Sequence, residues 1–147
     1  PPGTGDIQLT LSQHIPVTGS VVVTTPQDIA LIDARKAVDM FHKVNIPIFG
    51  VLENMSVHIC SQCGHHEALF GSDGGKLLAE KLKVPLLGQL PLSLPVREAM
   101  DNGAASKLLA QQPEIARIYT EAAFNIALAV ADKGRDFSGR FPKIVVE

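Results

Sequence analysis

The sequence predicts an α/β fold in which a parallel sheet is flanked by helices. Two apolar runs carry this prediction: the β-branched run Val21–Val23 and the run from Ile48 to Leu52 are both typical of strands buried on both faces. The residues between them, 24–44, carry a helical pattern. A strand, a helix and a strand within about thirty residues form a βαβ crossover, which joins parallel strands.

The remaining elements follow in chain order. Turn residues at 1–6 precede a short helical pattern at Ile7, Leu9 and Leu11. We expect the helix over 24–44 to begin with Thr24-Thr25 as its cap and Pro26 in its first turn. Its apolar stripe repeats at spacings of four and three and comprises Ala30, Ala34, Ala37, Phe41 and Val44.

The second half of the chain predicts one more strand and three helices. We expect a helix after Gly74-Gly75, a third strand over Leu86–Leu90, and a short helix over 95–102 that Gly103 closes. A long helix over 113–132 should cover one face of the sheet. The final stretch, 143–146, fits either an edge strand or an ordered end.

Composition limits the classes of function. The 147 residues are 46% hydrophobic and 19% charged, with a net charge of -2, which indicates one globular domain. Without a basic cluster or tryptophan, and with one tyrosine, the chain is not expected to bind nucleic acid or a membrane surface. Two cysteines without a secretory signal indicate a reducing compartment, and we expect the cytoplasm.

The stretch from Glu53 to His66 holds both cysteines and three of the five histidines. A Cys-x-x-Cys pair on a turn brings two thiolates to one metal, but that is half of a tetrahedral set. His58, His65 or His66 can complete a zinc site, or a second chain can supply its own pair around zinc or a four-iron cluster. A redox dithiol fits less well, because no apolar helix opens after Cys63.

Three further stretches are candidates for nucleotide contact. Gly3, Thr4, Gly5 and Asp6 form a loop whose backbone N–H groups can approach a phosphate, although an ordinary capped turn explains it equally well. Asn54 follows a strand end, where its amide can pair with a purine edge or simply make a turn. Pro91 ends the third strand at the same kind of edge.

The motifs together resemble those of the Mrp/ApbC family of iron–sulfur carrier ATPases, which are MinD-like P-loop proteins. The resemblance runs from residue 1 to about residue 105, and Cys-x-x-Cys after Asn-Met-Ser is its most specific part. The matching motifs, in order, are Pro1–Asp6, Thr24–Asp28, Glu53–Ser56, Cys60-x-x-Cys63-Gly64 and Phe70-Gly71.

The resemblance implies a homodimer that holds a labile 4Fe-4S cluster between two Cys-x-x-Cys pairs and delivers it to apo iron–sulfur proteins. ATP binding or hydrolysis, with Mg²⁺, would control delivery in the full-length protein. Cys60 and Cys63 resemble the cluster ligands, residues 1–6 the γ-phosphate switch, and Asn54 and, more loosely, Pro91 the adenine contacts. The resemblance transfers no ligand role to the three histidines.

The sequence departs from this family in one large respect. Its members carry a Walker A loop and an aspartate ahead of the first switch proline, and neither is in this sequence, so we assign no catalytic residue. We therefore expect one partial domain over residues 1–147, similar to the carboxyl-terminal part of a MinD-like P-loop NTPase and inactive alone as an ATPase. The alternative function is a non-catalytic module with structural zinc at the cysteines and histidines.

Overall fold

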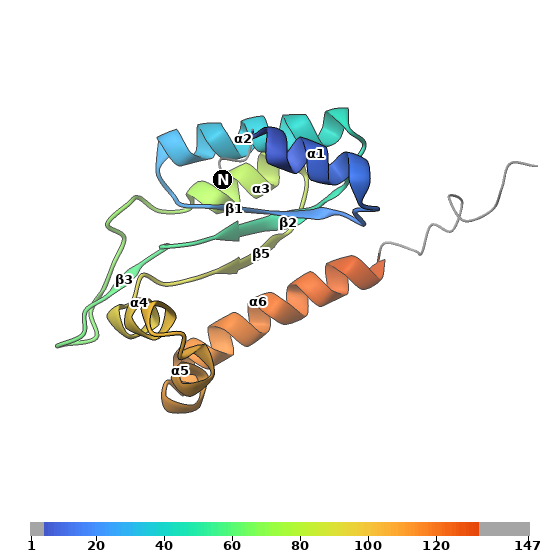
Figure 1. Cartoon of the computed structure of the whole chain (residues 1–147). Coiled ribbons are helices and arrows are strands. Elements are labelled where there is room, and N and C mark those ends of the chain that lie inside the picture. The colour runs from blue at the N-terminus through green and yellow to red at the C-terminus, as the bar shows by residue number, and fades with distance from the viewer. Residues whose placement is uncertain (1–4, 133–147) are drawn as a thin grey trace, which may run out of the picture.

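The computed structural model describes residues 5–132, which form a parallel sheet with helices on both faces (Figure 1). The three strands lie in the order β1-β2-β5, and both neighbouring pairs are parallel, as predicted. The strands are β1 (Ser20–Thr24), β2 (Ile48–Glu53) and β5 (Leu86–Gln89). A separate antiparallel hairpin consists of β3 (His58–Ile59) and β4 (His66–Glu67).

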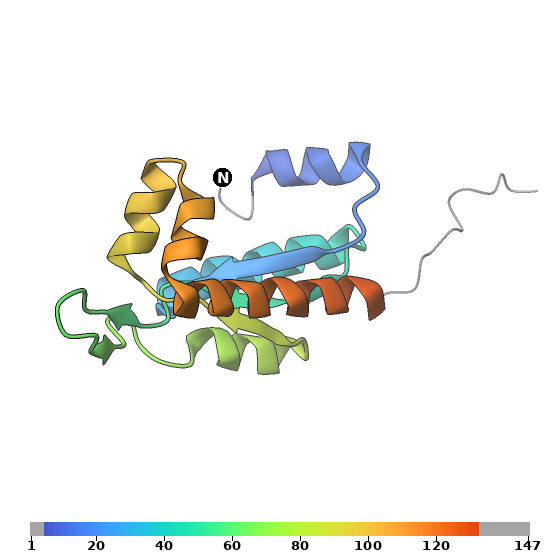
Figure 2. The same cartoon turned by 90° about the horizontal axis from the view of Figure 1, so that it is seen from below.

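The helices divide between the two faces of the sheet. Figure 1 shows α2 (Asp28–Lys43) and α3 (Gly74–Leu82) over one face and α6 (Pro113–Asp132) over the other. The short helices α4 (Leu94–Asp101) and α5 (Ala105–Gln111) connect β5 to α6. Figure 2 places α1 (Asp6–His14) beyond the β1 edge of the sheet. Within residues 5–132, no helix combines the length and the apolar character that crossing a membrane requires.

The main core lies between β1, β2, α2 and α3. Val38 and Val51 are fully buried, and Leu78 is 1% exposed. Burial of each such side chain contributes roughly 1.5–3 kcal/mol to folding, so this layer fixes the crossover helix on the sheet. The cluster comprises Val22, Leu31, Ala34, Val38, Ile48, Val51, Leu78 and Ala79.

The helix of the crossover begins later than predicted. It starts at Asp28, with Gln27 at the cap position in extended conformation, so neither threonine caps it. Thr24 instead pairs with Glu53 in the sheet, and the Thr25 hydroxyl donates a hydrogen bond to Gln27 Oε1. The predicted stripe is partly right: Ala34 and Ala37 are buried, but Leu31 and Val38 supply the larger core contacts.

The predicted burial of β1 on both faces is wrong. Val22 is 5% exposed and faces the core, whereas Val23 is 58% exposed. The reason is the position of α6, which packs mainly over β5 and β2, so that Val23 on the corresponding face of β1 is left largely exposed. The sequence analysis also missed α5, a seven-residue helix whose Leu108 is buried.

Two adjacent leucines in α3 test this description of the core. Leu78→Ala should lower the free energy of unfolding by about 3 kcal/mol, because it leaves a cavity in the main core. Leu77→Ala is the matched control: Leu77 is 61% exposed, and its loss should cost less than about 0.5 kcal/mol. Urea denaturation measures both, and equal losses would contradict the orientation of α3.

Candidate functional site

The cysteines lie on an excursion of the chain that we call the cysteine hairpin, residues 54–73, between the end of β2 and the start of α3. It projects beyond the carboxyl ends of the sheet strands (Figures 1 and 2). Its attachment, the hairpin base, is a set of backbone hydrogen bonds to the segment after β5. Ser56 N donates to Leu90 O (3.0 Å), Leu92 N to Val57 O (2.8 Å), and Ile59 N to Leu92 O (3.1 Å).

The tip of the hairpin is a tight turn that contains both cysteines. Gly64 N donates to Cys60 O (2.9 Å), and Cys60 N donates to His65 O (3.0 Å). Gly64 has a φ of +69°, a conformation that glycine adopts without steric cost. Cys60 is half-buried, Cys63 is exposed, and both are free thiols. The structure thus brings the two predicted ligands together on one accessible turn.

The turn also favours the thiolate form of Cys60. The backbone N–H of Gln62, then that of Cys63, and finally the Cys63 thiol form hydrogen bonds that lower the pKa of the Cys60 thiol below its usual value. Partial desolvation acts in the opposite direction and is the smaller effect. A thiolate is the form that binds metals, so the turn favours the form of Cys60 that its predicted role as a ligand requires.

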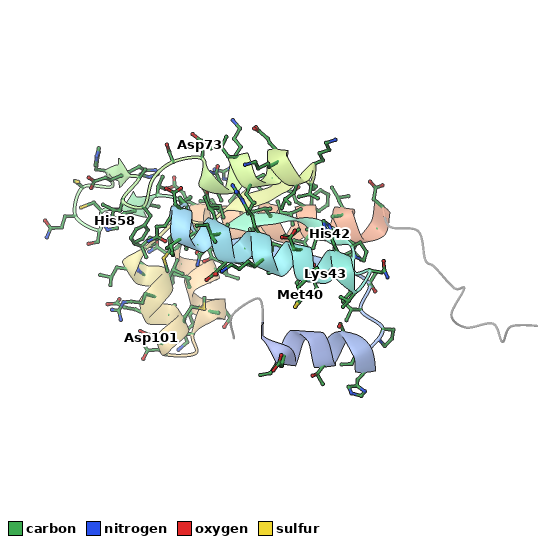
Figure 3. The ribbon with its side chains drawn as sticks, turned by 90° about the horizontal axis from the view of Figure 1, so that it is seen from above. Met40, His42, Lys43, His58, Asp73 and Asp101 are labelled. Atoms are coloured by element: carbon green, nitrogen blue, oxygen red, sulfur yellow. The ribbon has the colours of Figure 1, made fainter. Side chains whose placement is uncertain are left out.

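The histidines do not join the cysteines. The hairpin register places His58 opposite Glu67 and His66 opposite Ile59. His65 and His66 are exposed, and Figure 3 shows His58 at the hairpin end of the molecule. Among the residues that the structure describes, no three histidine, cysteine or acidic side chains are grouped to hold a metal ion. A zinc site within one chain is therefore not favoured.

Asn54 and Pro91 lie at the ends of the neighbouring strands β2 and β5. Asn54 N donates to Thr24 O (2.7 Å), and the Asn54 side-chain oxygen accepts a hydrogen bond from Met55 N (3.0 Å). Asn54 is half-buried and Pro91 is buried. The structure brings both to the carboxyl edge of the sheet, and the side-chain oxygen of Asn54 takes part in a turn. A purine contact stays a prediction.

The predicted phosphate loop lies mostly outside the described residues. Gly3 and Thr4 are not described, whereas Gly5 occupies the N-cap position of α1 with an ordinary φ of −74°. Asp6 begins α1 and is exposed. Asp6 contributes negative charge to the first turn of the helix, which is favourable there. The phosphate-sensing role of residues 3–6 stays a prediction.

Sequence reasoning missed Glu53, the last residue of β2. Its side chain is 1% exposed, and its carboxylate accepts hydrogen bonds from Gly75 N (2.5 Å) and Gln89 Nε2 (2.7 Å). The only signal in the sequence is an acidic residue that ends an apolar strand, immediately before Asn54. A buried carboxylate needs partners of this kind, and nothing local to the sequence identifies them.

Comparison with known proteins supplies the family. A family model described as "ParA: NUBPL iron-transfer P-loop NTPase" matches residues 1–127. The chain is 55% identical over 139 residues to the "Iron-sulfur cluster carrier protein" of Escherichia coli, covering 95% of this chain and 38% of that protein. It is 54% identical over 103 residues to the "Iron-sulfur cluster transfer protein NUBPL" of Mus musculus, covering 70% of this chain and 32% of that protein.

A solved structure is also similar. It is a nucleotide-binding protein from Archaeoglobus fulgidus in complex with ADP, with a TM-score of 0.62 and 34% sequence identity. The match covers 71% of this chain and 43% of that one. The chain therefore shares part of the fold of a nucleotide-binding protein, and it spans less than half the length of these relatives.

The geometry of the turn predicts how Cys60 reacts. Iodoacetamide should alkylate Cys60 in the folded chain at a lower pH than in the urea-unfolded chain, because the hydrogen bonds from residues 62 and 63 stabilise its thiolate. By linkage, a lowered pKa in the folded state adds stability as pH rises through that range and removes it on acidification. Peptide mass spectrometry after timed alkylation measures the profile, and identical profiles would refute the effect of the turn.

Proposed function

This chain belongs to the NUBPL iron-transfer P-loop NTPases of the ParA group, and on that premise we propose that it carries a 4Fe-4S cluster as cargo to apo iron–sulfur proteins. One observation supports the proposal above the others. Cys60 and Cys63 share an exposed turn whose backbone N–H groups favour the thiolate of Cys60. The turn belongs to the hairpin that projects beyond the sheet (Figure 1), and Cys63 is exposed, so a recipient protein has access to it.

The proposal includes a second copy of the chain. A cubane cluster takes four thiolate ligands, and each chain offers two. A homodimer that joins two cysteine hairpins supplies the full set, with the cluster on the symmetry axis. Separation of the two copies removes half of the ligands at once, which converts tight binding into release.

The proposal assigns control of release to ATP and Mg²⁺ in the full-length protein. Asn54, proposed to contact adenine with Pro91, is the first residue of the cysteine hairpin. Residues 3–6 are the proposed phosphate contacts. The similar protein from Archaeoglobus fulgidus was solved with ADP, which supports nucleotide use by this fold. We place the transfer in the cytoplasm, where thiols stay reduced.

Anaerobic reconstitution with iron and sulfide tests the cargo. The wild-type chain should hold about four irons and four sulfides per dimer, as a four-iron cluster bridged by two cysteine pairs requires. Cys60→Ala should lose both, because only two thiolates per dimer remain. Ser61→Ala is the matched control, since it changes an exposed residue of the same turn and removes no thiol.

Metal analysis and size exclusion give the readout. An iron-free chain that binds roughly one zinc per monomer would overturn the proposal in favour of structural zinc. A cluster retained by Cys60→Ala would overturn the assignment of the ligands.

The isolated 147-residue chain should not hydrolyse ATP. Its sequence contains neither the glycine-rich lysine loop nor the magnesium-binding hydroxyl that follows it, so the charge of the transition state has no partner. Phosphate release should therefore equal that of a no-protein blank. Turnover above the blank that Asn54→Ala abolishes would show that the chain contains a complete ATPase site.

A further inference from the structure

Glu53 places a buried carboxyl group at the point where the cysteine hairpin leaves the sheet. Each of its carboxylate oxygens has one donor: Gly75 N binds Oε2 and Gln89 Nε2 binds Oε1. A buried carboxyl group is costly unless its oxygens are hydrogen-bonded, and here each oxygen has a donor. Glu53 and Gly75 lie next to the two ends of the cysteine hairpin, at the end of β2 and in the first turn of α3.

The two legs of the hairpin meet at this residue. The outgoing leg begins at Asn54, the next residue in the chain. The returning leg ends at Asp73, which Figure 3 labels at the start of α3. Asp73 is the N-cap residue of α3, has left-handed backbone angles and makes no side-chain capping bond. Glu53 takes over that role from another element by accepting the N–H of Gly75, in the first turn of the helix. The carboxylate thus joins the two ends of the cysteine hairpin.

A third contact connects Glu53 to the hairpin base. Gln89, which donates to Glu53, directly precedes Leu90, and Leu90 N donates to the backbone oxygen of Glu53 (2.7 Å). Leu90 O in turn accepts hydrogen bonds from Ser56 N and from Ser56 Oγ (3.1 Å). The side chain of Glu53 thus bonds to α3 and to the end of β5, and its backbone oxygen bonds to Leu90 at the hairpin base.

Adjacent glycines make this approach possible. A Cβ on Gly75 would lie 2.9 Å from Glu53 Oε2 and 2.8 Å from Glu53 Cβ. A Cβ on Gly74 would lie 2.6 Å from the carbonyl oxygen of Pro26. The start of α3 thus packs closely against both the end of β2 and the loop after β1. The Glu53 carboxylate is the polar group where α3 contacts β2.

We propose that Glu53 is a positioning residue: its carboxylate clamps the returning leg of the cysteine hairpin to the strand from which the outgoing leg departs, and so fixes the direction in which Cys60 and Cys63 are presented. The consequence for cargo rests on the proposed function, because a fixed direction matters where two hairpins share one cluster. Loss of the clamp should speed cluster loss without a matching loss of the fold.

Two substitutions separate the hydrogen bonds from the charge. Glu53→Ala removes both acceptors and leaves Gly75 N–H buried and unpaired. Glu53→Gln keeps the shape, because its amide oxygen accepts from Gly75 N while its amide nitrogen donates to Gln89 with that side chain turned over. Val38→Ala is the control for general destabilisation, since Val38 is fully buried in α2, outside the hairpin.

The measurement is the rate at which the reconstituted chain loses its cluster to a chelator, well below the unfolding midpoint. Glu53→Ala should release cluster about tenfold faster, the factor that corresponds to one buried donor left unpaired. Glu53→Gln and Val38→Ala should stay close to the wild-type rate. The proposal is overturned if Glu53→Ala releases at the wild-type rate, if Val38→Ala matches Glu53→Ala, or if Glu53→Gln is as fast as Glu53→Ala.

Amide hydrogen exchange on the cluster-free wild-type chain tests the clamp separately. If Glu53 joins the two legs, the amides of Gly75, Ser56 and Leu92 should open as one unit, with a common free energy of opening once each exchange rate is corrected for its intrinsic value. Different opening free energies for Gly75 and for the hairpin base would refute the clamp even if a cluster binds. A common opening free energy in a chain that binds no cluster would sink the proposed function and leave the clamp standing, and this readout needs no folded variant.

Discussion

The structure depends on backbone hydrogen bonds that continue past the ends of the sheet strands. Asn54 N binds Thr24 O, Leu90 N binds Glu53 O, and Ser56 N binds Leu90 O, so the ladder passes from β1 through β2 to β5 and into the hairpin. Parallel strands bring their carboxyl ends to one edge, where open α/β sheets bind ligands. Here the rigid part of the molecule extends directly into the segment that bears the cysteines.

The molecule therefore has two parts with different properties, a packed core and an exposed hairpin tip. The core residues of α2, β2 and α3 are buried and close-packed, whereas the tip of the hairpin is held mainly by its own turn. A stiff base limits the directions in which the thiols can point, and an exposed tip lets a second protein reach them. The proposed cargo site, which has to both hold and release a cluster, would use each property.

Much of this fold could be predicted from the sequence, because the relevant signals are local. The apolar runs at 21–23 and 48–52, the repeat in 113–132 and the Cys-x-x-Cys pair need only neighbouring residues to be recognised. The start of α2 was misplaced because pairing of Thr24 with Glu53 outweighs its capping tendency. Val23 and Glu53 escaped prediction for a related reason: their environments are set by α6, α3 and Gln89, far away in sequence.

The turn that favours the Cys60 thiolate has a consequence for handling the chain. Accessible thiols of lowered pKa are those that peroxides convert to sulfenic acid, and a neighbouring thiol then closes a disulfide. Cys63 is exposed and hydrogen-bonded to Cys60, so it is placed to be that neighbour. Air oxidation of this turn would remove both proposed ligands while the sheet stayed intact. The time for which a sample is exposed to air, rather than its unfolding, would then limit the fraction of the protein that can bind iron.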